Sequence, residues 1–118
     1  MAEKANGNIL LDTESALQHV QGDEEFLREI YQIFLDEIPG RRENFEQALG
    51  KKEMQTVVGY AHSLKGVALT IGAGTCHKTA LELETAAREG DELKVQEMYR
   101  QLENILGQLE SKLSEMFS

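Results

Sequence analysis

The chain has 118 residues, with 12 Lys and Arg against 21 Asp and Glu, and its formal charge is −9. This length suits one domain with its own core, and the acidic excess argues against a nucleic-acid partner. Cys76 is the single cysteine, so a fold held by an internal disulfide is excluded. The N-terminus lacks a signal-peptide pattern, and no apolar run reaches the roughly 20 residues of a membrane span. We therefore expect a cytoplasmic protein without a membrane segment.

The composition favours α-helix along almost the whole chain. Leu, Glu, Gln, Lys and Ala are abundant, and there is one proline. We expect residues 1–10 to form a flexible N-terminal arm and residues 11–118 to form one helical domain. In chain order, the expected helices cover residues 12–21, 24–38, 41–49, 53–71 and 75–89, and about 25 residues after Asp91.

Several of these boundaries carry residues that suit helix starts or breaks. Short oxygen-bearing side chains bind the free amides of a first helical turn. The residues expected to cap helices in this way are Asp12 or Thr13, Asp23, Thr75 and Asp91. Pro39 and Gly40 are expected to interrupt the second helix or bend it, because proline lacks the amide that a helix needs.

Apolar residues recur every three or four positions, as on the buried side of amphipathic helices. In residues 53–71 the inner positions are Val57, Ala61, Leu64, Ala68 and Ile71. In residues 24–38 they are Phe26, Ile30, Ile33 or Phe34, and Leu35 or Ile38. Short connections between such helices favour antiparallel neighbours, so we expect an all-α fold: an antiparallel up-down four-helix bundle with one or two additional short helices.

His62 is the residue that the sequence marks most strongly for chemistry. Lys65 and Gly66 follow it by three and four positions, which places all three on one side of a helix. Position 62 lies about 100° round the helix from the inner Ala61, so the imidazole is expected at the edge of the buried stripe. A neutral imidazole there can accept a phosphoryl group as a nucleophile, with Lys65 as counter-charge. The alternative is a partly exposed histidine without a role.

Two glycines inside the same expected helix support the chemical interpretation. Gly59 and Gly66 lie at −3 and +4 from His62, and each costs about 1 kcal/mol relative to alanine. A glycine within a helix usually has a packing or access reason. We expect both to leave an open surface area on which a partner can dock, although close packing between helices is an alternative. Val58 and Leu69 are the apolar candidates for that area.

Glu84 is expected to face His62 across an antiparallel helix pair. If the turn centres near Ala73, His62 lies 11 residues before it and Glu84 lies 11 residues after it. A carboxylate at the same height can accept a hydrogen bond from one imidazole nitrogen, which leaves the other free to attack. The alternative is that Glu84 simply faces water.

Together these residues resemble the histidine-containing phosphotransfer (HPt) domain of bacterial phosphorelays. The resemblance covers residues 10–113, and its matching segments are residues 22–27, 61–66, 71–72, 83–84 and 90–91. It implies a four-helix bundle whose exposed histidine takes a phosphoryl group from one receiver-domain aspartate and passes it to another. By this resemblance His62 is phosphorylated, Lys65 is the nearby positive group and Gly66 gives access. Glu84 stands where members place a glutamine or glutamate that bonds the imidazole.

The resemblance also implies the partners. They are response-regulator receiver domains and a hybrid sensor histidine kinase, and the Mg²⁺ used in transfer sits on the receiver. The chain itself is expected to bind no cofactor and to act as a phosphoryl carrier without kinase or phosphatase machinery. We expect a monomer, and the start methionine and complete bundle favour a free-standing protein.

Three other functions compete with the relay. A metal site is disfavoured, because the Glu-x-x-His spacing of bundle metal sites is absent although His62, His77, Glu82 and Glu84 are possible ligands. An enzyme is disfavoured, because the chain has no phosphate-binding glycine loop. The remaining alternative is a helical docking module that binds a receiver or kinase and never carries phosphate.

Overall fold

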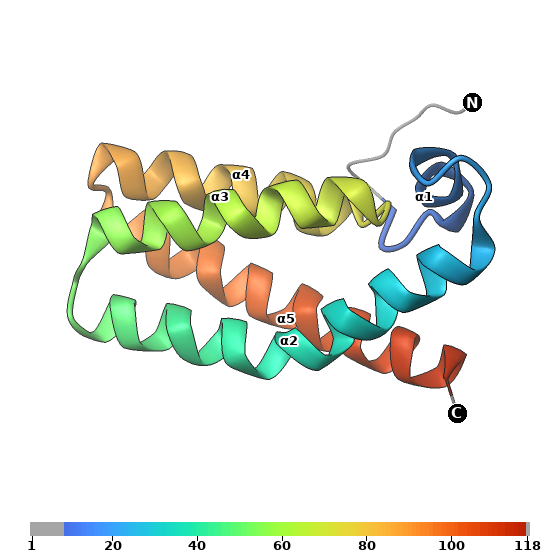
Figure 1. Cartoon of the computed structure of the whole chain (residues 1–118). Helices are drawn as coiled ribbons and strands as arrows, with labels where there is room; N and C mark the ends of the chain where they lie inside the picture. The colour runs from blue at the N-terminus through green and yellow to red at the C-terminus, as the bar shows by residue number, and fades with distance from the viewer. Residues whose placement is uncertain (1–8, 118) are drawn as a thin grey trace.

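A computed structural model describes residues 9–117 of the chain, which form five α-helices and no strand (Figure 1). The helices are α1 (Thr13–His19), α2 (Glu24–Gly50), α3 (Met54–Thr70), α4 (Gly74–Glu89) and α5 (Glu92–Met116). The four long helices run up and down as an antiparallel bundle, and α1 lies at one end of it (Figure 1). The predicted all-α bundle is therefore confirmed, with one short helix beside the four long ones. None of the described helices is both long and apolar enough to cross a bilayer.

The core lies between the four long helices, and α3 and α4 make the most extensive pair in it. All five inner positions predicted for residues 53–71 are fully buried. Opposite them, α4 contributes Cys76, Ala80 and Leu83, which are also fully buried. The small residues on these two helices let α3 and α4 lie close together along their whole length.

Helix α2 continues through Pro39, so residues 41–49 are not the separate helix that was expected. Phe34, Ile38, Phe45 and Ala48 are buried on both sides of the proline, and their shared burial holds the two halves in one helix. Pro39 itself is exposed, and the ribbon of α2 changes direction near its middle (Figure 1). This is the bend that a proline causes when it removes one helical hydrogen bond.

The buried side of α2 differs in part from the predicted stripe. Phe34 and Ile38 are buried, but Phe26 is 50% exposed and Ile33 is 57% exposed. Leu27 takes the inner position in place of Phe26. Phe26 and Ile33 therefore lie on the solvent side of α2.

Three of the expected helix caps form and one does not. The carboxylates of Asp12, Asp23 and Asp91 each accept a hydrogen bond from an amide in the following first turn. Thr75 is not a cap, because α4 begins one residue earlier at Gly74 and has no side-chain cap. The Thr75 amide instead donates to the carbonyl oxygen of Ile9 at 3.0 Å.

The described part of the N-terminal segment is bound to the turn between α3 and α4. Besides the Ile9 bond, the Asp12 amide donates to the Gly72 carbonyl oxygen at 2.8 Å. Leu10 packs against the core. The expected flexible arm otherwise falls on residues 1–8, which lie outside the described residues. The bonds at Ile9 and Asp12 attach the chain ahead of α1 to the end of the bundle that holds the turn between α3 and α4.

Candidate functional site

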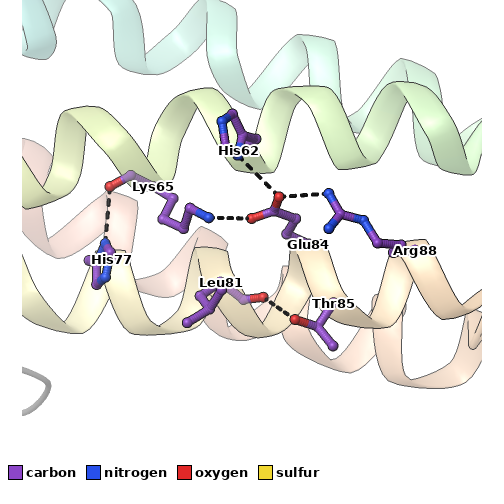
Figure 2. A network of polar contacts seen from close by, with 7 residues as sticks. All are labelled: His62, Lys65, His77, Leu81, Glu84, Thr85 and Arg88. Atoms are coloured by element: carbon purple, nitrogen blue, oxygen red, sulfur yellow. Dashed lines mark hydrogen bonds and ion pairs between the residues drawn. The ribbon is translucent and has the colours of Figure 1, made fainter.

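His62 and Glu84 lie opposite each other on α3 and α4 (Figure 2). The His62 Nδ1 atom is 3.1 Å from Glu84 Oε2. The imidazole side chain is 68% exposed, whereas the Glu84 side chain is 4% exposed. The two helices thus hold a buried carboxylate beneath an exposed ring, and Glu84 does not simply face water.

Two cations share the same carboxylate. Lys65 Nζ lies 2.8 Å from Glu84 Oε1, as an ion pair without the angular geometry of a hydrogen bond. Arg88 Nη2 donates to Oε2 at 2.9 Å, and Oε2 is also the oxygen that faces His62. The Lys65 ammonium is the largest influence on the pKa of Glu84 and lowers it; burial raises this pKa, and His62 lowers it further. Glu84 is therefore ionised near neutral pH.

An ionised Glu84 determines which imidazole nitrogen is free. A carboxylate can only accept hydrogen bonds, so Nδ1 of His62 must carry a proton and donate it to Oε2. In the neutral ring the lone pair then belongs to Nε2. Because Nδ1 faces the buried carboxylate and the ring is largely exposed, Nε2 is the nitrogen that a partner can reach.

The surface around His62 on α3 is open. A Cβ built at Gly59 or at Gly66 would meet no atom within 4 Å. Neither glycine is therefore needed for close packing between helices. Leu69, one turn beyond Gly66, is 55% exposed. We call the surface of α3 along Gly59, His62, Gly66 and Leu69 the open stripe.

Comparison with known proteins gives the family. The model of the Hpt domain family matches residues 29–112, which include the whole of α3 and α4. The chain belongs to the Hpt domain family. Hpt domains carry phosphoryl groups on histidine, so the chain is an intermediate of a phosphorelay. No curated protein sequence matches it.

Two solved structures resemble this Hpt domain over nearly its full length. One is the HPT domain from the Hpt sensor hybrid histidine kinase from Shewanella, with a TM-score of 0.82 and 20% identity over 95% of each chain. The other is histidine-containing phosphotransfer protein B (HptB) from Pseudomonas aeruginosa PAO1, with a TM-score of 0.81 and 24% identity over 92% of this chain and 95% of that one. At these identities, the likeness establishes the fold.

The apolar residues near the site are not equally accessible. Val58 is half-buried and packs against the core of the Hpt domain, in contrast to the exposed Leu69. Ile33 of α2 is exposed like Leu69, although the sequence placed it among the possible inner residues. The Tyr31 hydroxyl donates to the Ile71 carbonyl oxygen at 3.3 Å. Because α2 and α3 are antiparallel, this bond puts Ile33 and Leu69 at about the same height.

Sequence reasoning missed two residues of this Hpt domain that contact the site. Arg88 follows Glu84 by four positions, a spacing at which helical side chains of opposite charge meet, and that spacing was the available signal. The second is His77, which the sequence offered only as a possible metal ligand. Its Nδ1 atom donates to the carbonyl oxygen of Lys65 at 3.1 Å, because a carbonyl can only accept (Figure 2). No sequence pattern signals that second contact.

Possible metal ligands do not converge within residues 9–117 of the Hpt domain. No group of three or more His, Cys, Asp or Glu side chains there could hold an ion. Glu84, the most buried of the carboxylates near His62, is already surrounded by Lys65, Arg88 and the imidazole. The arrangement suits a nucleophile with an orienting carboxylate.

Proposed function

We propose that His62 Nε2 accepts a phosphoryl group from the aspartate of one receiver domain and passes it to the aspartate of another. The observation that supports this most is the contact between Nδ1 and Glu84, 3.1 Å long, beneath a ring that is 68% exposed. A buried hydrogen bond on one nitrogen fixes the tautomer and the ring orientation. The lone pair of the other nitrogen then points to the side from which a receiver arrives.

The transfer step needs no further group to remove a proton. The Nε2 lone pair attacks phosphorus, the bond from phosphorus to the receiver aspartate breaks, and that carboxylate leaves with the electron pair. The Nδ1 proton stays where it is, directed at Glu84. The reverse sequence on a second receiver returns the ring to its starting state.

We assign Lys65 the role of counter-charge to the phosphoryl group. Its Nζ atom forms an ion pair with Glu84 Oε1 at 2.8 Å, and its side chain is 22% exposed. A phosphoryl group brings roughly two negative charges to the same side of α3. We expect Lys65 to turn partly from Glu84 toward that group, and to influence the rate of transfer more than the fold.

The receiver is expected to land on the open stripe of α3. Gly59 and Gly66 leave the helix backbone uncovered there, and Leu69 with Ile33 supplies apolar contact area beside it. Val58 contributes from its half-buried position. An open surface of this kind lets two different receivers reach the same nitrogen.

We infer that the chain acts as a carrier without kinase or phosphatase machinery of its own. The Mg²⁺ and the aspartates that promote transfer are expected on the receiver, and no cofactor is expected on this chain. A hybrid sensor histidine kinase is the expected source of phosphoryl groups; one of the two structural relatives is the HPT domain of such a kinase. We expect the chain to work as a monomer in the cytoplasm.

The test is chemical. Receiver domains of the source organism are charged with radiolabelled acetyl phosphate, freed from it, and mixed with the chain. We expect label on the chain that is lost in acid and retained in alkali, as a phosphoramidate bond should be. The variant His62→Gln should take none, while His77→Gln and His19→Gln should retain labelling. A chain that binds a charged receiver and takes no label would be a docking module; equal labelling of His62→Gln would reject the assignment of the residue.

A further inference from the structure

We propose that Glu84 keeps the Nδ1 proton on His62 while the ring is phosphorylated, and so makes phospho-His62 a labile, readily reversible phosphoryl donor. This inference rests on the proposed function. It concerns the charge of the residue at position 84, and not only its ability to accept a hydrogen bond. A glutamine at this position could accept the same bond without a charge.

The contact with Glu84 favours retention of the proton on Nδ1 of His62. Glu84 Oε2 lies 3.1 Å from Nδ1 (Figure 2). The Glu84 side chain is 4% exposed, so the carboxylate is almost completely shielded from water. Electrostatic attraction is stronger in such a setting than in solvent. When phosphorus bonds to Nε2 of a ring that still carries the Nδ1 proton, the ring becomes a cation. Its positive charge then lies directly against the negative charge of Glu84.

Charge balance favours this state. Lys65 and Arg88 are both cations and Glu84 is one anion, so the cluster around a neutral imidazole carries one net positive charge. The phosphoryl group adds roughly two negative charges. The phosphorylated cluster is therefore neutral only if the ring keeps its extra proton. With glutamine at position 84, the same cluster is neutral when the ring has lost that proton.

The protonation state decides how well the ring leaves. When the phosphoryl group is transferred, the bond between phosphorus and Nε2 breaks and its electron pair returns to Nε2. If Nδ1 carries a proton, the departing group is a neutral imidazole. If Nδ1 has none, the departing group is an imidazolate anion, which leaves much less readily. Retaining the proton therefore speeds transfer and hydrolysis.

Other charged groups near the ring do not distinguish the two cases. From α3 and α4 these are Lys65 and Arg88, described above. On the α2 side, the groove next to Ser63 is lined by Asp36, Glu37 and Arg41, and Arg41 is paired with Glu37 at 3.1 Å. All of them remain when Glu84 is replaced. A difference between Glu84 and glutamine thus reports the charge at position 84.

Phosphoramidate, a small-molecule phosphoryl donor, provides a test without a partner protein. Wild type and Glu84→Gln are loaded with it, freed from donor, and followed by ³¹P NMR as phospho-His62 hydrolyses, from about pH 5.5 to about pH 9. Both rates should fall as pH rises. The wild-type midpoint should lie higher by about one pH unit, because an opposite charge within hydrogen-bond distance favours the charged ring. Above both midpoints, wild type should lose its phosphoryl group about tenfold faster.

The variant Glu82→Gln is the matched control. Glu82 is an exposed glutamate of the same helix that lines a groove with Lys94 of α5, and its replacement changes the net charge by the same amount. Its pH profile should overlay that of wild type. Coincident profiles for wild type and Glu84→Gln would overturn the inference and leave the relay role intact. If wild type takes a phosphoryl group neither from phosphoramidate nor from a charged receiver, the relay role would instead be overturned.

Discussion

The amide of Asp12 and the carbonyl oxygen of Gly72 are joined by a hydrogen bond of 2.8 Å, which ties the start of α1 to the turn between α3 and α4. Gly72 has a φ angle of +78°, and a Cβ at this position would fall against the Asp12 carbonyl oxygen. The turn that sets the register of His62 and Glu84 is therefore also the docking point of the N-terminal segment.

Replacing Gly72 with alanine should destabilise the protein by at least about 2 kcal/mol, because the side chain adds a clash with backbone to an unfavourable φ angle. Urea denaturation followed by circular dichroism measures this loss. Gly90→Ala is the control, since Gly90 has a φ angle of +73° and no atom within 4 Å of its Cβ position. A loss no greater than that of Gly90→Ala would show that the backbone at Asp12 moves away from the added side chain at little cost in free energy.

Glu84→Gln should lower stability at pH 7 by about 1–3 kcal/mol, because Lys65 and Arg88 lose the buried carboxylate that pairs with them. The pKa of Glu84 is lowered in the folded state from its ordinary 4.5. Its stabilising contribution is thus complete above pH 4.5 and is lost as pH falls through the lowered value.

Unfolding free energies of wild type and Glu84→Gln, measured from neutral to acid pH, should converge below that point. Glu37→Gln is a suitable control, because Glu37 forms an ion pair with Arg41 while 49% exposed and should matter little at any pH. A gap that stays constant down to acid pH would mean that the charge of Glu84 does not stabilise the fold.

Gly66→Leu should block transfer and leave the bundle intact. A Cβ at this position has no atom within 4 Å, and leucine favours helix over glycine by up to about 1 kcal/mol, so the melting temperature should not fall. Transfer from a charged receiver should slow more than about tenfold, since losing about 1.4 kcal/mol of docking energy suffices. Gly50→Leu, equally open but at the end of α2, should transfer normally. Unchanged transfer by Gly66→Leu would remove Gly66 from the docking surface.

Lys52→Gly should stabilise the protein by about 0.5–1 kcal/mol, because Lys52 has a φ angle of +56° and glycine adopts this conformation without strain. The ion pair that it makes with Glu92, 3.6 Å long with side chains 70% and 51% exposed, contributes little. Thermal melts of Lys52→Gly and Lys51→Gly provide the comparison. Lys51 has a φ angle of −94°, so its replacement should give no gain. Equal effects of both would refute the conformational explanation.

Cys76 should resist thiol reagents in the native state. It is fully buried, and burial raises the pKa of its thiol to about 12. Ellman's reagent at pH 8 should therefore react slowly with the folded protein and rapidly with the protein in guanidinium chloride, where one thiol per chain is expected. Rapid reaction of the folded protein would mean that α4 opens readily.

The sequence predicted the features that depend on nearby residues. Asp12, Asp23 and Asp91 cap helices through amides three positions away, and the spacing from Val57 to Ile71 marks the buried side of α3. Counting from the turn also brought Glu84 to the height of His62.

Features that depend on distant residues were not predicted. The start of α4 is set by the carbonyl of Ile9 and not by a Thr75 cap. The continuity of α2 through Pro39 depends on burial against the other helices, which outweighs the loss of one hydrogen bond. Lys65 reaches Glu84 only because α3 and α4 lie side by side.

The open stripe of α3 has a consequence for how the relay is controlled. His62 presents one nitrogen on one side, while Glu84 and α4 close the other. If receivers dock on this stripe as proposed, donor and acceptor would visit the same surface in turn and could not bind together. A receiver that has already lost its phosphoryl group competes with the next charged donor. The direction of net flow through this chain would thus depend on the relative abundance of its receivers as well as on their phosphorylation.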